Sequence, residues 1–423
     1  MQAVILVAGK SSRFYPFTNV AHKALVKIMG KTLLEHTLLS IKTTGITDII
    51  IVVNRDNPIE QILGDGQRLG LTIHYAIQHE PRGMGDALLQ AAPYITGEFF
   101  LTNANHSDFH EFYQAMVEKN RGKDDIVLLG RKQEVTGIYG CMQIEGDKVT
   151  GFIEKPTDMI QSSLRHIGIY LFTRAYLEVL KQTPQDENHL EHAIDAYAKQ
   201  GRVTFVETEK ETLTLKYAWD LLGIKNYLLR DLSHFISPDA EVASHAIIES
   251  PVYIDSGAKV FEGACLKGPC YIGKNAVVGT NALVRGGTCI EEKAVAGAYM
   301  EMTNTLMMHE STTHSGFIGD SVIGSKTKIG AMICTANVRL DRRNISAEVR
   351  KKKIDSFRRH LGAVVGDNVT VGAGVITMPG IIIGNDTVIG PATTVMENVP
   401  DKTTYYTDFR TIVQRKIRGE NKV

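Results

Sequence analysis

Two patterns of hydrophobic and polar positions divide the chain. In the N-terminal half, short apolar runs alternate with stretches in which apolar residues recur at helical spacing. The apolar runs are 3–8, 48–53, 71–77 and 99–102, and the helical stretches include 32–40 and 86–92. This alternation predicts an α/β layer with a mostly parallel sheet. Ligands of such sheets bind beyond the carboxyl ends of the strands, where the loop 9–13 and the turn 103–106 fall.

In the C-terminal half, an aliphatic residue recurs at almost every sixth position. The positions are Ile254, Val260, Leu266, Ile272, Val278, Val284 and Ile290, and later Val365, Val371, Thr377, Ile383, Ile389 and Val395. A period of six fits neither an α-helix nor a simple strand. It predicts a parallel β-helix, in which each repeated residue points into a continuous core. We place the boundary near Ser237, with domains 1–236 and 237–423.

A basic insert interrupts the repeats at about 339–360. Its charges are Arg342, Arg343, Arg350, Lys351, Lys352, Lys353, Arg358 and Arg359. One interpretation is a solvated loop or helix that projects from a corner of a coil. The other is an arm that contacts phosphate, for example in a coenzyme A nucleotide.

Composition excludes several classes of protein. The 47 basic and 47 acidic residues balance, which argues against bulk electrostatic binding to nucleic acid or to acidic membranes. The five cysteines form no CxxC framework, which favours free thiols in a reducing compartment. The first apolar run is too short for a signal peptide or a membrane span, so we expect a cytoplasmic protein.

The first apolar run leads into a loop with candidate phosphate chemistry. Gly9 allows the backbone to approach a ligand closely, Arg13 sits at the following turn, and Lys23 comes ten residues later. The loop is neither a Walker loop nor a G-x-G-x-x-G loop. Backbone N–H groups and two cations suit a triphosphate, because they offset the charge that grows as pyrophosphate leaves.

These residues carry a resemblance to a known family. Residues 6–18 read LVAGKSSRFYPFT, followed by His22-Lys23 and later by Glu154-Lys155-Pro156. The pattern L-x-x-G-x-[GS]-[ST]-R-x-x-P-[LF]-T, then P-K and E-K-P, is that of the sugar-1-phosphate nucleotidylyltransferases. The chain is most similar to the bifunctional N-acetylglucosamine-1-phosphate uridylyltransferase / glucosamine-1-phosphate acetyltransferases, especially their archaeal branch, through YAWDLLGIKNYLL. The resemblance implies a Rossmann-like nucleotidyltransferase domain followed by a left-handed β-helix of hexapeptide repeats.

The resemblance also implies roles, which we carry over position by position. Leu6, Ala8, Gly9, Gln78 and Gly83 would bind the nucleotide, Arg13 and Lys23 its phosphates, and Gly140, Glu154 and Lys155 the sugar and its phosphate. The family reaction joins an NTP to a sugar 1-phosphate with Mg²⁺ and needs no covalent intermediate. The metal ligands would be Asn105 and Asp220.

Several positions depart from the family pattern. Asn105 stands where the family has Asp, and Mg²⁺ prefers charged oxygen ligands, so we expect weaker metal binding. Asp108 lies three residues further on and is a candidate to compensate. His22 replaces a proline, Met84 a threonine, His166 an asparagine and His192 an aspartate. These changes leave the sugar and the base open.

The repeats also match an acetyltransferase region in part. His314 matches the proposed general base, and Arg285 and Asn337 match further positions. Four other positions differ from the family pattern, namely Thr303, Phe317, Lys328 and Met332. We expect a degraded acetyl-transfer site with acetyl-CoA as a doubtful cofactor, and, by analogy with the family, a homotrimer through the β-helix.

Three functional hypotheses follow. The first is a nucleotidylyltransferase that forms an NDP-sugar and pyrophosphate. The second is a non-catalytic relative that binds nucleotide or sugar as a regulatory or assembly subunit, motivated by Asn105, His166, Thr303 and Met332. The third is an acyltransferase that uses the β-helix alone.

Overall fold

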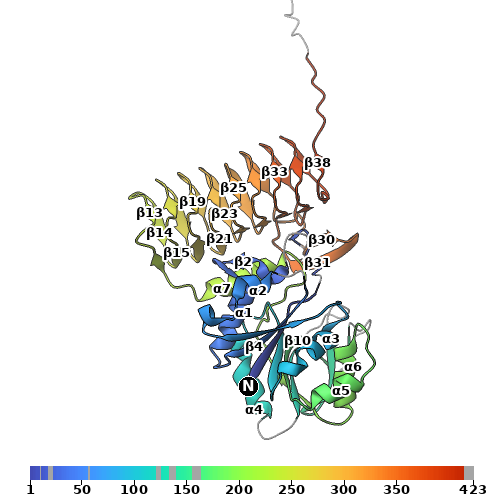
Figure 1. Ribbon diagram of the computed structural model, residues 1–423. Coiled ribbons are helices and arrows are strands. Elements are labelled where there is room, and N and C mark those ends of the chain that lie inside the picture. Colours follow the sequence, from blue (N-terminus) through green and yellow to red (C-terminus); the bar gives the residue numbers. More distant parts are fainter. Residues whose placement is uncertain are drawn as a thin grey trace, which may run out of the picture.

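The structure is a computed structural model that describes residues 1–9, 11–17, 22–55, 58–120, 125–132, 140–154 and 163–413. A mixed α/β part carries a long rod of stacked coils across one end (Figure 1). Lys155, one of the predicted sugar-phosphate contacts, lies outside the described residues.

A nine-stranded sheet forms the centre of the α/β part. Its order is β5-β4-β1-β6-β10-β7-β11-β9-β8. The strands are β1 (Gln2–Leu6), β4 (Asp48–Val53), β5 (Thr72–Ile77), β6 (Phe99–Asn103), β7 (Ile126–Arg131), β8 (Cys141–Glu145), β9 (Lys148–Ile153), β10 (Ser163–Phe172) and β11 (Val203–Glu207). β1 runs parallel to β4 and β6, whereas β10 runs antiparallel to β6 and β7. The strands predicted from the apolar runs are confirmed.

Helices cover both faces of this sheet. They are α1 (Leu33–Lys42), α2 (Ile59–Leu63), α3 (Met84–Ala91), α4 (His110–Asn120), α5 (Tyr176–Gln182) and α6 (His189–Ala198). One hydrophobic core joins α3, α5 and α6 to one face, and a second joins α1, α2 and α4 to the other. α1 begins at a capping box, in which the Thr32 hydroxyl accepts the Glu35 N–H and the Glu35 carboxylate accepts the Thr32 N–H.

The rod is a parallel β-helix built from three sheets. The first contains β12 (Phe235–Ile236), β15 (Val252–Ile254), β18 (Cys270–Ile272), β21 (Thr288–Ile290), β24 (Leu306–Met307), β27 (Val322–Ile323), β32 (Val364–Val365) and β35 (Ile382–Ile383). The second contains β13 (Glu241–Val242), β16 (Lys259–Val260), β19 (Val277–Val278), β22 (Val295–Ala296), β25 (Thr312–Thr313), β28 (Lys328–Ile329), β33 (Thr370–Val371), β36 (Val388–Ile389) and β38 (Thr404–Tyr405). The third contains β14 (Ile247–Glu249), β17 (Cys265–Lys267), β20 (Leu283–Val284), β23 (Met300–Thr303), β26 (Gly316–Gly319), β29 (Ile333–Thr335), β34 (Ile376–Thr377) and β37 (Thr394–Val395).

The repeat of six residues is the side of one coil. Ile254 pairs with Ile272, and Ile272 with Ile290, so one turn of the rod takes 18 residues over three sides. Every repeated residue named from the sequence is at most 4 % exposed. The predicted β-helix is therefore confirmed, and its core is the stack of these side chains.

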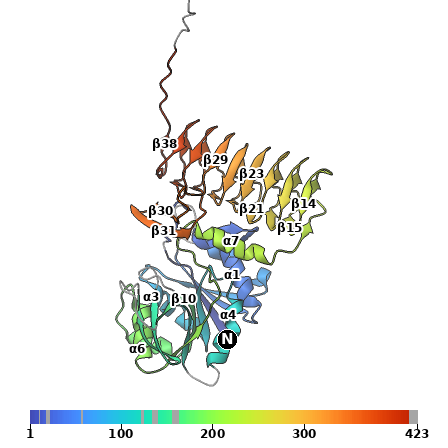
Figure 2. The ribbon, with the colours of Figure 1, turned by 180° about the vertical axis from the view of Figure 1, so that it is seen from behind.

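The basic insert is a β-hairpin, so the predicted loop or helix was wrong. β30 (Ile345–Val349) pairs antiparallel with β31 (Lys352–Arg358). Ile345, Ala347 and Val349 alternate with polar residues and are buried, which is the period of a half-buried strand. The hairpin lies between the rod and the α/β part, beside α7 (Asp220–Arg230), in both views (Figures 1 and 2).

The junction of the two parts has its own hydrophobic core. It gathers side chains from the loop after β1, from α7, from the coils and from the hairpin, including Phe14, Phe17, Trp219, Leu222, Tyr271, Leu306, Ile345 and Ala347. Polar contacts cross it as well. The Asn385 amide donates to the Pro16 carbonyl at 2.6 Å, and the Tyr15 hydroxyl donates to Asp401 at 3.0 Å. The rod therefore supports the segment that follows the glycine-led loop.

Three further predictions concern the chain as a whole. β12 begins at Phe235, just before the proposed boundary at residue 237, and the two-domain division stays a proposal. None of the five cysteines forms a disulfide; Cys141, Cys270 and Cys289 are buried, whereas Cys265 and Cys334 are partly exposed. Within the described part of the chain, every helix is too short or too polar to span a lipid bilayer.

Candidate active site

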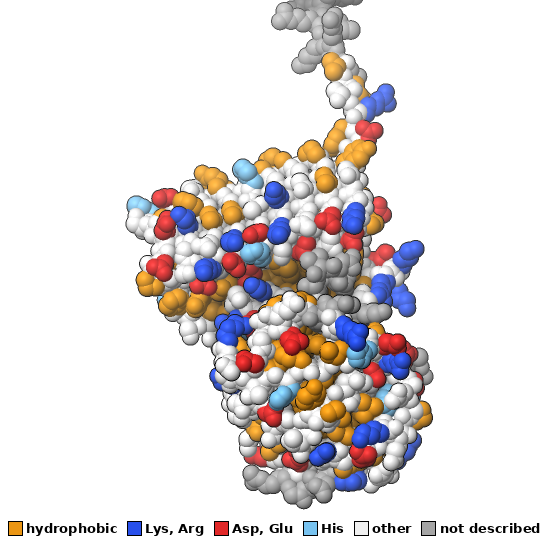
Figure 3. All heavy atoms as spheres, in the orientation of Figure 1, with side chains coloured by type: hydrophobic (Ala, Val, Ile, Leu, Met, Phe, Trp, Pro, Cys, Tyr) orange, Lys and Arg blue, Asp and Glu red, His pale blue; other side chains and the backbone are white. Residues whose placement is uncertain are grey.

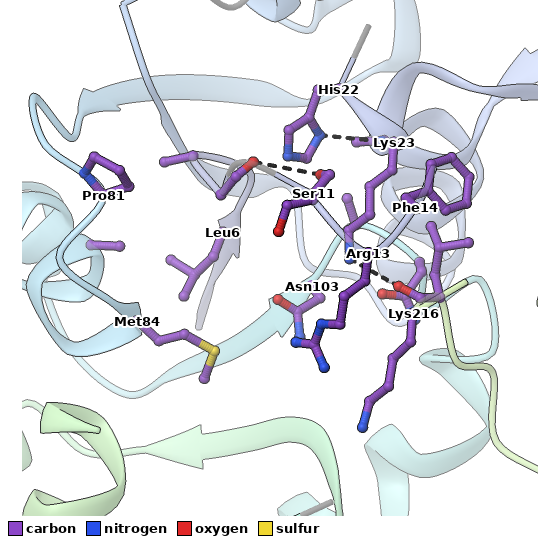
Figure 4. Close-up of a pocket in the computed structure, with 18 of the residues that line it drawn as sticks. Leu6, Ser11, Arg13, Phe14, His22, Lys23, Pro81, Met84, Asn103 and Lys216 are labelled. Atoms are coloured by element: carbon purple, nitrogen blue, oxygen red, sulfur yellow. Dashed lines mark hydrogen bonds between the residues drawn. The ribbon is translucent and has the colours of Figure 1, made fainter. Parts of the chain in front are cut away.

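A cavity of about 510 Å³ opens at the carboxyl edge of the sheet, next to the ends of β1 and β6. It brings together eight of the residues predicted from the sequence, namely Leu6, Ala8, Gly9, Arg13, Lys23, Gln78, Gly83 and Asn105. Figure 4 shows Arg13 and Lys216 reaching toward this space from different segments. The parallel strands explain the gathering, because their carboxyl ends meet at one edge.

The glycine-led loop is open on its ligand side and anchored at its far end. Among the described residues other than its chain neighbours, no heavy atom lies within 4 Å of the position that a Cβ on Gly9 would occupy, so the backbone is accessible to a ligand. The Phe14 N–H donates to the Ser11 carbonyl at 2.8 Å and closes the turn. Phe14 and Phe17 are buried in the junction core. These anchors leave Arg13 exposed at the cavity.

Lys23 is enclosed beside other charges. Its ammonium group donates to the Leu215 carbonyl at 3.0 Å. Burial and the nearby Arg13 lower the pKa of Lys23 to about 8, while Asp220 acts in the opposite direction. The ammonium is therefore charged at neutral pH but loses its proton more readily than an ordinary lysine.

The residue before Lys23 is a neutral helix cap. The Nδ1 atom of His22 accepts the Ala24 N–H at 3.2 Å, at the start of the short 3₁₀ helix Lys23–Leu25. Burial, followed by the charge of Lys23, lowers the pKa of His22 to about 4. Histidine in place of the family's proline thus keeps the turn that presents Lys23 without adding a charge.

Gln78 supports the turn before α3. Its amide nitrogen donates to the Gly83 carbonyl at 3.1 Å and to Asp86 at 2.7 Å. Gly83 has φ +109°, and a Cβ there would lie 3.0 Å from the Glu187 carbonyl, so the turn requires glycine. Contact of these two residues with a base stays a prediction.

The two predicted metal ligands line different cavities. Asn105 lines the first cavity, and its amide nitrogen donates to the Leu213 carbonyl at 3.2 Å. Asp220 lines a second cavity, of about 1040 Å³, and the segment 213–216 runs between the two. Burial raises the pKa of Asp220, although the N–H groups of Lys216 and Tyr217 donate to its Oδ2 at 2.7 and 2.9 Å.

Asp108 already has partners at both carboxylate oxygens. Oδ1 lies 3.1 Å from His106 Nδ1, and Oδ2 accepts the Leu213 N–H at 3.0 Å. The second bond fixes Leu213 at the start of the segment 213–216, so Asp108 has a structural role in addition to the metal role that the sequence suggests.

The predicted sugar contacts lie at the same sheet edge. A Cβ on Gly140 would be 2.7 Å from a Glu154 carboxylate oxygen, so these two residues adjoin. The His166 N–H donates to the Gly140 carbonyl at 2.8 Å. The His166 ring packs against Tyr170 at 4.3 Å and Phe152 at 5.5 Å, and burial lowers its pKa to about 3. A neutral ring wedged among aromatics thus replaces the family's asparagine.

Two of the three acetyl-transfer candidates in the rod, Arg285 and Asn337, already have side-chain partners. His314 is exposed after β25. Arg285 pairs with Glu301 at 3.1 Å, and the Asn337 amide donates to Asp320 at 2.6 Å. Met332 has φ +60° and a side chain that is 69 % exposed, so it projects into solvent from a corner.

Sequence reasoning missed several residues that line the first cavity. Ser12, Phe14, Asn103 and Lys216 are among them. Asn103 ends β6 and is the first residue of the turn 103–106, but it was given no role of its own. Lys216 lies in the run LKYAWD that leads to Asp220, and its place close to a predicted metal ligand is a signal for this residue in the sequence.

Fold and cavity together define a nucleotide-binding α/β protein joined to a parallel β-helix. The Nucleotidyl transferase family matches residues 2–230, and the chain belongs to this family of enzymes. Similar proteins extend over nearly the whole chain. "Bifunctional protein GlmU" of Methanococcus vannielii is 29% identical, with 98% of this chain and 100% of that protein covered. "Bifunctional protein GlmU" of Methanococcus maripaludis is 31% identical with the same coverage. A "Bifunctional sugar-1-phosphate nucleotidylyltransferase/acetyltransferase" of Sulfurisphaera tokodaii is 30% identical, with 94% and 98% covered.

Proposed function

We propose that the protein transfers a nucleotidyl group from an NTP to a sugar 1-phosphate, which yields an NDP-sugar and pyrophosphate. The observation that carries the proposal is the cavity in which Gly9, Arg13 and Lys23 meet at one edge of the sheet. The names of relatives that cover nearly the whole chain support the sugar-1-phosphate class of acceptor.

The chemistry needs alignment and positive charge rather than a protein nucleophile. A phosphate oxygen of the sugar 1-phosphate attacks the α-phosphorus of the NTP, and the bond to the β-phosphate oxygen breaks as pyrophosphate leaves. Arg13 and Lys23 offset the charge that develops on the leaving group. The accessible backbone at Gly9 would let N–H groups approach the phosphates.

The protein offers Mg²⁺ two candidate ligands, of which one is charged. Asn105, whose amide nitrogen donates to the Leu213 carbonyl, offers a carbonyl oxygen to the first cavity, and Asp220 offers a carboxylate from the second cavity, across the segment 213–216. Mg²⁺ often takes only one or two protein ligands and completes its shell with water and substrate phosphates. When bound, it would polarise the phosphate oxygens; the ligand assignment remains a proposal.

The test is pyrophosphate release by the full chain from a panel of NTPs and sugar 1-phosphates with Mg²⁺ or Mn²⁺. We expect turnover with at least one pair, and loss of turnover in Lys23→Met. A folded protein that is silent with every pair would instead support the non-catalytic hypothesis, and rescue by Asn105→Asp would locate the defect at the metal site.

Acetyl transfer is a second candidate, because relatives named bifunctional cover the rod as well as the α/β part. The observation that favours it is exposed His314, an available base on the coil surface. The partners of Arg285 and Asn337 compete with a substrate for these side chains. Calorimetric titration with acetyl-CoA tests the activity, and absence of binding would remove it.

For assembly we propose a homotrimer in the cytoplasm, with no nucleic-acid partner. Apolar side chains gather along the outer edge of the rod (Figure 3). Ile247 of β14 and Ile376 of β34 lie on the third sheet of the rod, and these two residues, Met396 and Tyr406 are all at least 39 % exposed. A second and third copy would cover such surface. Light scattering behind size exclusion should give three times the 46.7 kDa chain mass, and a monomer would contradict the proposal.

A further inference from the structure

Three cations line the first cavity, and the proposed reaction uses two of them. Among the described residues of its wall, the lysines and arginines are Arg13, Lys23 and Lys216. His22 also lines the cavity, but its pKa is lowered to about 4, so the ring is neutral at pH 7. Arg13 and Lys23 face the leaving pyrophosphate in the proposed function. Lys216 is therefore the cation that remains for a second anion in the same cavity.

The local sequence turns Lys216 toward the cavity. Burial alternates along the run 213–216, in which Leu213 and Leu215 are at most 8 % exposed and belong to the junction core. Such alternation is the pattern of a half-buried extended segment. Lys216 follows the two leucines as a partly exposed residue, and its side chain lines the first cavity.

Contacts fix the chain on both sides of Lys216. Before it, the Leu215 carbonyl accepts the Lys23 ammonium group at 3.0 Å. After it, the Tyr217 ring stacks on Trp219, with ring centroids 4.6 Å apart and planes at 12°. Trp219 is itself buried in the junction core. A backbone held on both sides presents the Lys216 side chain from a defined point.

The Lys216 side chain points away from the glycine-led loop. In Figure 4 it runs away from Ser11 and His22, toward the side of the cavity on which Asn103 lies. The cavity thus has a loop side, formed by residues 9–13 and Lys23, and a β6 side, formed by Asn103 and Lys216.

Asn103 connects the β6 side of the cavity to the predicted sugar contacts. It ends β6, and β10 is the next strand of the sheet. The Asn103 amide nitrogen lies 2.9 Å from the position that a Cβ on Gly168 would occupy, so Asn103 packs against β10. The same strand carries His166, whose N–H donates to the Gly140 carbonyl. An acceptor that extends from these sugar contacts into the cavity would enter beside Asn103 and Lys216.

The proposed reaction requires an anion on the β6 side. In a phosphoryl-type displacement, the attacking and leaving oxygens lie roughly in line on opposite sides of the phosphorus. Because Arg13 and Lys23 face the leaving pyrophosphate, the attacking phosphate enters from the opposite side. Two anions approach each other there, and a cation placed at that point offsets their repulsion.

We propose that Lys216 binds the phosphate group of the sugar 1-phosphate on the β6 side of the first cavity and positions its oxygen for attack on the α-phosphorus. This inference rests on the proposed function. The attacking oxygen supplies the electron pair of the new bond, and the pair of the broken bond leaves with pyrophosphate. A phosphate monoester has a second pKa of about 6, so the oxygen is already deprotonated and Lys216 transfers no proton. The ammonium group on its flexible stem acts as a point charge for this phosphate.

The first experiment compares steady-state constants of the full-length protein with those of Lys216→Met, which removes the charge. Loss of a charged hydrogen bond should raise KM for the sugar 1-phosphate by about tenfold or more, with KM for the NTP nearly unchanged. Lys216→Arg should recover part of the loss. Lys199→Met, at an exposed site, is the matched control, and thermal unfolding confirms that each variant is folded.

Three results would overturn the inference. One is Lys216→Met behaving like Lys199→Met. Another is a raised KM for the NTP, or for pyrophosphate in the reverse reaction, with an unchanged KM for the sugar 1-phosphate, which would assign Lys216 to the loop side. The third is a raised Mg²⁺ requirement as the only change, which would confine Lys216 to supporting the metal site.

A second measurement requires no turnover and separates this inference from the proposed function. Tripolyphosphate, as a probe of the loop side, is titrated by calorimetry into the wild type, Lys23→Met and Lys216→Met, and inorganic phosphate is then titrated into each protein with tripolyphosphate bound. Lys23→Met should weaken mainly tripolyphosphate binding, and Lys216→Met mainly phosphate binding. If the wild type is silent on the substrate panel, the proposed function fails, yet this pattern still supports the anion site at Lys216. Phosphate binding that is equal in the wild type and Lys216→Met, or absent from the wild type, overturns it.

Discussion

Glu291, on the first sheet side of the rod, accepts the backbone N–H of Met29 at 2.7 Å. Its other carboxylate oxygen accepts the N–H of Gly30 at 3.0 Å, so one buried side chain joins the coils to the turn between β2 (Lys27–Ile28) and β3 (Lys31–Thr32). The contact spans 262 positions of sequence. It makes the stability of the junction dependent on a titratable group.

Glu291→Gln should change how stability depends on pH. Burial raises the pKa of Glu291 from its usual 4.5 to about 7, although two N–H donors act in the opposite direction. The folded protein then holds the proton more tightly than the unfolded chain. The contribution of Glu291 is complete below pH 4.5 and is lost as pH rises through about 7. The variant lacks this titration.

Thermal unfolding between pH 5 and 8 measures the effect. Wild type should lose stability relative to Glu291→Gln as pH rises across this range, whereas Glu262→Gln, at an exposed site on the rod, should run parallel to wild type. Parallel curves for wild type and Glu291→Gln would contradict the prediction.

Lys23 should set an alkaline limit on turnover. Because the pKa of Lys23 is lowered to about 8, the cation needed beside the phosphates disappears as pH rises through that value. We expect kcat/KM for the NTP to fall above pH 8, and Lys23→Arg to move this limb upward. Lys23→Met should reduce kcat by roughly 10²–10³. Lys31→Met, at an exposed site, is the control, and an unshifted limb in Lys23→Arg would disprove the assignment.

Asn105→Asp should strengthen Mg²⁺ binding and should lower the stability of the metal-free protein. A carboxylate binds Mg²⁺ better than an amide does, so the Mg²⁺ concentration for half-maximal rate should fall several-fold. The new carboxylate would also face the Leu213 carbonyl, to which the Asn105 amide now donates. Without metal, this loss should cost about 1–3 kcal/mol. Titration of rate against Mg²⁺ and unfolding with and without Mg²⁺ measure both effects. An unchanged Mg²⁺ dependence would show that Asn105 is not a ligand.

Lys225→Met should weaken the junction strongly. The Lys225 ammonium is fully buried in α7 and donates to the Gly287 carbonyl, to Asn304 at 3.0 Å and to Asn226 at 2.7 Å. Burial lowers its pKa to about 8, so it is still charged at pH 7. Its removal leaves the acceptors on Gly287, Asn304 and Asn226 without this charged donor, at a cost of about 1–3 kcal/mol. The urea midpoint should fall, whereas Lys199→Met, on the surface, should leave it unchanged.

Sequence reasoning located the first cavity because its residues follow local rules. Gly9, Arg13 and Lys23 lie in one short stretch after an apolar strand, and the strand order brings Gln78 and Asn105 to the same edge. It did not place Lys216 in this cavity, and it did not predict that the basic insert forms a pair of strands. The alternation of Ile345, Ala347 and Val349 was a readable signal for a strand, but nothing local states what that strand packs against.

The sequence by itself determined the repeating parts of this protein. Each secondary structure buries residues at a fixed spacing, and the six-residue spacing of the coils is directly visible in the chain. Only the tertiary structure decided that the rod packs against the α/β part, that the insert packs beside α7, and that Asn105 and Asp220 line different cavities. The physical reason is that these contacts join segments hundreds of residues apart, and they depend on which buried surfaces fit together rather than on any local period.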